Sequence, residues 1–213
     1  MLTGKSTFLT FIALFGATIF GSGLHAEVFN GPTTLKDKTF DTLTINGPAE
    51  LRGIKARILE VNGPLTFNDL EVSGKTIISG PMIGRHADLQ DIVVKGALNA
   101  KDIEISTLEV TGHANLKEFT IIEKTVIRGT LFAQDGIFEE LVVDSSEGGN
   151  VVELCDVTVR KNIMISKGAK AEVLTLTGDT DVAGDITFES GEGKVVKEGD
   201  DIKLAGKIIG SKK

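Results

Sequence analysis

The sequence predicts an all-β fold, a single-stranded parallel β-helix (β-solenoid) in which the chain winds into a stack of short coils. Three observations predict it: a glycine returns at a regular interval of about 16 residues, apolar residues recur at fixed distances from that glycine, and no amphipathic-helix pattern appears. A repeat of this kind indicates a solenoid in which each coil buries the apolar side chains of its neighbours.

The repeat is clearest where the glycine lies in an Asn-Gly-Pro or Ser-Gly-Pro triplet, and four such triplets hold all four prolines of the chain. Proline cannot donate to a sheet, so the triplet predicts a corner between strands. Glycine allows the bend, and we expect the asparagines of successive coils to pair their amides along the corner. The predicted corner residues are Asn30, Gly31, Pro32, Asn46, Gly47, Pro48, Asn62, Gly63, Pro64, Gly80, Pro81, Gly96, Gly112 and Gly129.

Columns counted from this glycine alternate between apolar and polar. The column directly before the glycine is polar, and the column two residues before it is always apolar. Alternation with a period of two predicts strands with one buried face. A sandwich or an up-and-down barrel is the alternative, but either would show hairpin signals rather than a fixed coil length. The apolar column consists of Phe29, Ile45, Val61, Ile78, Val94, Val110 and Ile127.

The same spacing, carried towards the C-terminus, predicts further corners at Ser145, Lys161, Gly178 and Gly206. We therefore expect about 10 to 11 coils of about 16–17 residues, wound right-handed. One solenoid domain would span residues 27–213, with irregular coils from about residue 186 to residue 213.

The first 26 residues have the layout of a secretory signal peptide. Lys5 precedes an almost wholly apolar run over residues 8–21, and Ala26 supplies a small residue at a plausible cleavage site. The alternative is a transmembrane anchor, but the run is shorter than the ~20 residues that cross a bilayer. We expect export to the periplasm, the cell surface or the medium, with no stable membrane span after cleavage.

Composition and the scatter of polar residues argue against several classes of function. The net charge of −7 argues against nucleic acid and anionic membranes, and the chain has no Trp or Tyr to form a sugar-binding platform. The separation of His86 and His113 is not a multiple of the coil length, so they should not stack. We expect no catalytic residue, no metal site, no cofactor and no enzyme. The outward acids are expected to be scattered over the corners: Asp69, Asp88, Asp102 and Glu118.

Cys155 is the single cysteine, so no disulfide can form within one chain. Counted from the predicted corner at Ser145, it falls in a mostly polar column, at least partly exposed. An odd cysteine in an oxidising compartment can pair between molecules, which makes Cys155 a candidate intermolecular thiol. The alternative is a half-buried thiol that packs as a small apolar residue.

The glycine-punctuated coils and the C-terminal stretch DVAGDITFESGEGKVV…IKLAGKIIG resemble the bactofilins, a group of polymer-forming β-helix proteins. The resemblance lies in the style of the repeat and covers most of the chain after residue 26. It implies a right-handed triangular helix that assembles through its ends without a nucleotide. Bactofilins are cytoplasmic, whereas this chain carries an export signal, so an exported bacterial family of β-helix proteins is the matching expectation.

The two ends of the predicted stack bear on function. The first coil begins within a few residues of the predicted cleavage site, and the tail IKLAGKIIGSKK is typical of one more coil. Uncapped strand edges recruit other chains, so we expect the rod to associate end to end or to dock on an envelope or host protein. An exported, non-catalytic structural scaffold is the predicted function. The alternative is a secreted adhesin or partner-binding module, and the least favoured interpretation is a carbohydrate-active enzyme, which acids clustered around an outward groove would support.

Overall fold

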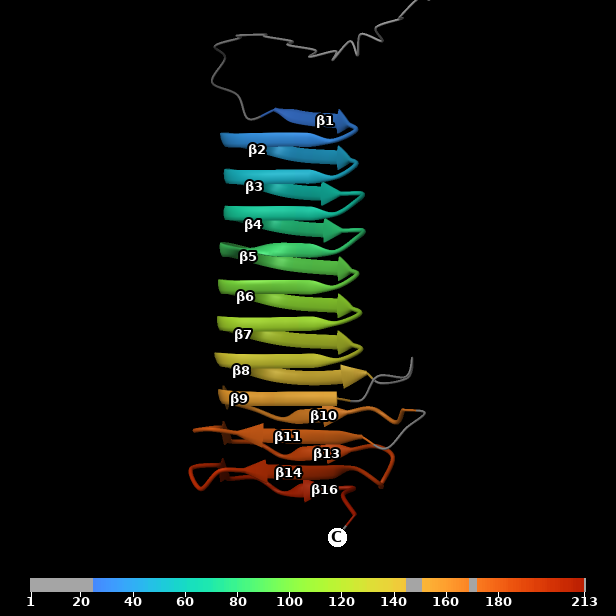
Figure 1. Cartoon of the computed structure of the whole chain (residues 1–213), viewed down its shortest axis with the longest axis vertical. Helices are drawn as coiled ribbons and strands as arrows, with labels where there is room; N and C mark the ends of the chain where they lie inside the picture. The colour runs from blue at the N-terminus through green and yellow to red at the C-terminus, as the bar shows by residue number, and fades with distance from the viewer. Residues whose placement is uncertain (1–24, 145–150, 169–171, 213) are drawn as a thin grey trace, which may run out of the picture.

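The computed structural model is a rod of stacked coils (Figure 1), and it confirms the predicted all-β parallel solenoid. It describes residues 25–144, 151–168 and 172–212. These residues contain strands and turns but no helix, and accordingly none that is long and apolar enough to cross a membrane. Apart from His25 and Ala26, the predicted signal peptide lies outside the described residues.

The regular part of the rod consists of coils that are each almost one continuous strand. Every strand pairs in parallel with the next strand along the chain, and equivalent residues lie opposite each other apart from one-residue register shifts in four of the pairings. The strands are β1 (Ala26–Asn30), β2 (Thr33–Asn46), β3 (Ala49–Val61), β4 (Leu65–Ile78), β5 (Met82–Lys95), β6 (Leu98–Thr111), β7 (Ala114–Arg128) and β8 (Leu131–Asp144).

The C-terminal coils are broken into shorter strands. One face of the rod continues from β8 through β10 and β13 to β16, and the other faces continue through the remaining strands. These strands are β9 (Val151–Val159), β10 (Ile163–Ile165), β11 (Val173–Thr177), β12 (Asp181–Val182), β13 (Ile186–Phe188), β14 (Lys194–Glu198), β15 (Lys203–Leu204) and β16 (Ile208–Ile209).

Each regular coil contributes six inward side chains, which stack on those of the next coil to form six interior columns. The column predicted two residues before the glycine is confirmed, since Ile45 pairs with Val61, Val61 with Ile78, and each is fully buried. This apolar burial is the main favourable term in the fold. In the third strand the six inward residues, all buried, are Ala49, Leu51, Ile54, Ala56, Leu59 and Val61.

The glycine corner has the geometry predicted for it. Asn46 Nδ2 donates to Asn30 Oδ1 at 2.9 Å, and Asn62 Nδ2 donates to Asn46 Oδ1 at 2.9 Å, which confirms the amide ladder. Gly47 has a φ of 148°, and a Cβ there would lie 2.7 Å from the carbonyl carbon of Gly31. Successive corners therefore approach so closely that only glycine fits between them.

The register predicted beyond Gly129 is wrong. Val143 pairs with Ile165, and Ile165 pairs with Phe188, so each of these coils is several residues longer than the repeat. The described solenoid therefore has about seven regular turns, and the longer coils begin after Asp144, earlier than the predicted residue 186, while the face that runs from β1 to β16 stacks 11 strands. These coils have more residues between consecutive strands, so the chain returns to each face later than the repeat predicts. The constant spacing predicted four further glycine-type corners. Three of these residues are not in the glycine-corner column of the rod: Lys161, Gly178 and Gly206. The fourth, Ser145, lies outside the described residues.

Two threonines interrupt one of the interior columns. Thr76 and Thr125 are fully buried where neighbouring coils place leucine or isoleucine, and neither hydroxyl has a hydrogen-bond partner. Both lie just after the extra residue that shifts the register between strands β4 and β5 and between β7 and β8. An unpaired buried hydroxyl destabilises a fold because it loses its hydrogen bonds to water.

We expect Thr76→Val and Thr125→Val each to raise the free energy of unfolding by about 1 kcal/mol, because valine keeps the branched shape and removes the unpaired hydroxyl. Urea unfolding followed by circular dichroism measures the change. The matched control is Thr66→Val, at an exposed threonine of β4, which should leave the stability unchanged. A loss of stability at both buried sites would contradict the explanation.

Candidate functional site

The second corner of each coil lies six residues after the glycine and needs a left-handed backbone. Seven residues other than glycine adopt a positive φ there, between 50° and 60°. Aspartate tolerates this conformation better than most residues, which explains why it predominates in the column. Gly53 takes the same place in β3, with a φ of 59°. The seven residues are Asp37, Asp69, His86, Asp102, Glu118, Asp135 and Asp156.

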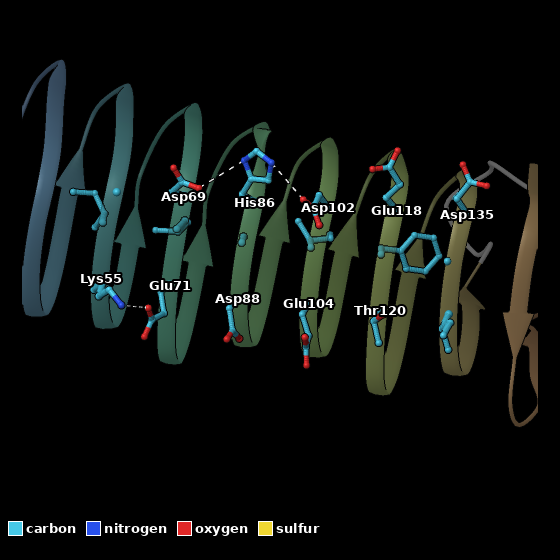
Figure 2. A pocket seen from close by; sticks show the side chains of 18 of the residues that line it. Lys55, Asp69, Glu71, His86, Asp88, Asp102, Glu104, Glu118, Thr120 and Asp135 are labelled. Atoms are coloured by element: carbon cyan, nitrogen blue, oxygen red, sulfur yellow. Dashed lines mark hydrogen bonds and ion pairs between the residues drawn. The ribbon is translucent and has the colours of Figure 1, made fainter.

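This corner forms one wall of a groove along the side of the rod. Figure 2 shows the two rows of side chains, with Asp69, His86 and Asp102 in one row and Glu71, Asp88 and Glu104 in the row opposite. The residues between the rows, such as Leu70 and Ile103, are almost fully buried and lie at the floor of the groove. The groove has a volume of about 880 Å³ and is open to solvent along its length.

The groove is acidic. Eight carboxylates line it, against Lys55 and His86 as the only basic residues among the described lining residues. Some of this charge is balanced, since Lys55 pairs with Glu71 and Lys101 Nζ lies 3.0 Å from Glu118 Oε1. The eight acids are Asp69, Glu71, Asp88, Asp102, Glu104, Glu118, Asp135 and Asp156.

Three of these acids, Asp88, Glu104 and Asp135, have no hydrogen-bonding or ion-pairing partner among the described residues. Asp88 pairs in register with Glu104, so two acidic residues lie directly opposite each other on strands about 4.8 Å apart. Like charges directly opposite each other on neighbouring strands are destabilising. A cation in this part of the groove would relieve that repulsion.

His86 lies between two acids of its own column. Its Nδ1 is 3.7 Å from Asp69 Oδ1 and its Nε2 is 3.3 Å from Asp102 Oδ2, so one imidazole contacts the coil before and the coil after. Nδ1 also lies 3.4 Å from Asn68 Oδ1. The ring is about half exposed, and it links three successive coils at the surface of the rod.

The prediction that the outward acids are scattered is wrong. Asp69, Asp102 and Glu118 share one wall of the groove, and Asp88 lies in the opposite wall. The signal was present in the sequence, since the acids of the first wall recur at the same spacing as the corner glycines. It is obscured because Gly53 and His86 interrupt the series of acids.

The two histidines do not stack, as predicted, because they lie at different corners. His113 belongs to the glycine corner, where its Nδ1 lies 2.5 Å from Thr130 Oγ1 and its ring packs 5.3 Å from that of Phe132. His86 belongs to the groove wall, so the two rings do not stack. Within the described ranges, no group of three or more His, Cys, Asp or Glu side chains is arranged to hold a metal ion.

Cys155 lies beside the groove corner rather than in the column predicted for it, since it pairs in register with Gln134 and Thr177. Its thiol is partly exposed and donates to Asp156 Oδ2 at 3.2 Å. A hydrogen bond with Thr177 lowers the pKa of the thiol, but the hydrogen bond to Asp156, burial, and the charges of Asp156 and Asp135 together raise it above its ordinary value. A raised pKa keeps the sulfur protonated and less nucleophilic.

The two ends of the rod present unpaired strand edges among the described residues. At one end β1 pairs with β2 alone, and at the other end β14, β15 and β16 each pair on one side only. Val28 of β1 and Ile208 and Ile209 of β16 are exposed there. The predicted end-to-end association stays a prediction, and the register identifies the side chains that a second copy would meet.

No protein-family model, no curated protein and no solved structure matches the chain. The resemblance to the bactofilins therefore stays a prediction. Among the described residues, two kinds of surface are open to a partner: the groove along the side and the strand edges at the ends.

We expect Asp156→Asn to increase the rate at which iodoacetamide alkylates Cys155 at pH 8 by about threefold. The variant removes the charge that disfavours the thiolate, and the Asn carbonyl can still accept the Asp179 N–H that Asp156 Oδ1 binds at 2.9 Å. Mass spectrometry of the alkylated chain gives the rate. Asp102→Asn, in the same column but on a distant coil, is the control and should leave the rate unchanged. An unaltered rate in Asp156→Asn would show that Asp156 does not control the thiol.

Proposed function

We propose that the protein is an exported, non-catalytic structural scaffold, a stiff rod that sets a distance between components of a bacterial envelope. The observation that supports this most is the continuity of the core, in which the same six interior columns run through every regular coil. A solenoid of this kind has a length set by the number of its coils, because each coil contacts only its neighbours.

The dimensions and the surface are consistent with a spacer. One face stacks strands from β1 through β8, β10 and β13 to β16, which corresponds to about 48 Å at ~4.8 Å per strand. Charged ladders cover the sides: Arg57 binds Asp41 of the preceding coil through both Nε and Nη2, at 2.6 Å and 2.9 Å. These pairs keep the side of the rod hydrated and link neighbouring coils.

The scaffold proposal predicts that function depends on the number of coils. Deleting residues 96–111 removes one complete repeat and joins Lys95 to Gly112, so the remaining coils keep their register and the rod shortens by about 5 Å. We expect the shortened chain to fold and yet fail to restore detergent resistance to a strain that lacks the gene. The control replaces residues 96–111 with a second copy of residues 80–95, which keeps the length and should restore resistance.

Full restoration by the shortened chain would contradict a role as a spacer. Fractionation of the cells tests the other half of the proposal, because a chain recovered only from the cytoplasm would contradict export. Every chain in both measurements retains residues 1–26.

The second candidate is a partner-binding module, which the acidic groove favours. Its partner would be an extended cationic segment, because the groove runs across several coils and three of its carboxylates, Asp88, Glu104 and Asp135, form no ion pair among the described residues. A polar, solvent-exposed groove of this kind supplies charge complementarity, which affects association rate and specificity more than affinity.

We expect an oligolysine peptide to bind the full chain, and Asp88→Asn with Glu104→Gln to weaken that binding about fivefold at low salt. Titration calorimetry at two salt concentrations measures the affinity and its screening. The matched control, Glu123→Gln with Glu153→Gln, removes two exposed acids outside the groove and should weaken the binding of the peptide much less. Equal losses in the two double variants would indicate attraction to the bulk charge and would exclude the groove as a specific site.

A carbohydrate-active enzyme is the third alternative, and the groove supplies the clustered acids that it would need. Such an enzyme would also need a basic group beside those acids. Lys55, the one lysine of the described lining, is already paired with Glu71. The groove therefore favours electrostatic binding over proton transfer.

A further inference from the structure

Among the described residues, charged side chains occupy the six interior columns only at the two ends of the rod. The buried carboxylate of Glu172, which accepts hydrogen bonds from Gly168 N–H and Ser190 Oγ, lies outside these columns. At the N-terminal end, Glu27 pairs in register with Leu43 and Lys38 pairs with Ile54. At the C-terminal end, Lys197 pairs with Leu176. Residues paired in a parallel sheet project to the same face, so these three charges lie in columns that elsewhere form the core.

The contrast with the rest of these columns is sharp. Leu43, Ile54 and Leu176, the partners of the three charged residues, are at most 1% exposed. Between the ends, every described residue of the six interior columns is apolar, glycine or threonine. Glu27, Lys38 and Lys197 are exposed, and each belongs to the last strand of its column among the described residues.

A second copy stacked in register would bury all three charges. If β1 of one copy continued the sheet beyond β16 of another, Glu27 would lie against Ile208. In the other columns Lys38 would lie against Ile202, and Lys197 against Leu35. Each charge would meet an aliphatic side chain with no counter-charge in its column, and burying an unpaired charge is strongly unfavourable.

We propose that Glu27, Lys38 and Lys197 prevent the rods from stacking head to tail. Inward-pointing charges on end strands are a known means by which β-proteins protect their open edges. The exposed backbone edges and the apolar residues Val28 and Ile209 would otherwise favour continued growth of the sheet. The proposal is independent of the scaffold and binding roles. It predicts discrete rods, in contrast to the end-to-end association that the sequence alone suggests.

The test compares the full chain, purified as the cell processes it, with the variant Glu27→Leu/Lys38→Ile/Lys197→Leu. Light scattering after size-exclusion chromatography gives the mass over a range of concentrations. We expect the wild-type mass not to grow beyond a dimer, and the variant mass at the highest concentration to exceed it by more than about twofold. Rods lengthened by whole copies should then appear in electron micrographs.

The matched control is Lys36→Leu/Lys194→Leu/Glu198→Leu, which changes the net charge equally and adds the same kind of apolar side chain to β2 and β14 but in outward positions. It should behave as the wild type. Growth of the wild-type mass with concentration, growth of the control to the same extent as the variant, or a variant that stays as small as the wild type would each overturn the proposal.

The milder variant Glu27→Gln/Lys38→Met/Lys197→Met keeps side-chain length and removes only the charges, so it remains informative where the first variant fails to fold. Circular dichroism verifies the fold of each chain. We expect this variant to associate more than the wild type, and a mass equal to that of the wild type would overturn the proposal.

Discussion

Parallel, in-register pairing of each coil on the next is the constraint on which the rest of the structure depends. Because every residue lies against its equivalent one coil later, a position has one environment throughout the regular coils. Every interior position must hold an apolar or small residue, every glycine corner must be compact, and every residue at the second corner must accept a positive φ. The hydrogen bonds of the ladder satisfy the main chain, and the columns bury the side chains.

Within a column, neighbouring side chains must also share a limited volume. Gly84 lies in register with Phe67, and a Cβ on Gly84 would come within 2.5 Å of the Phe67 ring. Gly136 stands in the same relation to Phe119, whose ring would be 2.2 Å away. A large side chain in one coil is therefore matched by the smallest in the next, which keeps the spacing of the coils uniform. Glycine in these columns is a packing residue rather than a turn signal.

The sequence predicted the columns and corners up to Gly129 because local alternation and a fixed repeat report directly on the buried face. It did not predict the longer coils after Asp144, since the added chain has no periodicity of its own and pairs such as Val143 with Ile165 are visible only in space. The acidic wall was predictable from its spacing, since Asp69 and Asp102 belong to one column, but each acid taken alone indicates only an exposed corner. Partners leave no comparable periodic signal.

The position of charge along the rod follows from the same constraint. In an outward column, acids on neighbouring coils such as Asp88 and Glu104 repel each other only modestly, because solvent screens their charges. In an interior column a charge between two coils would be desolvated without a counter-charge, and there is none in the six columns between the described ends. At an end, one side of the column is open to water, so Lys38 is tolerated there. An end charge therefore costs the monomer little and costs a stacked pair a great deal, which is the asymmetry that a device against unlimited stacking requires.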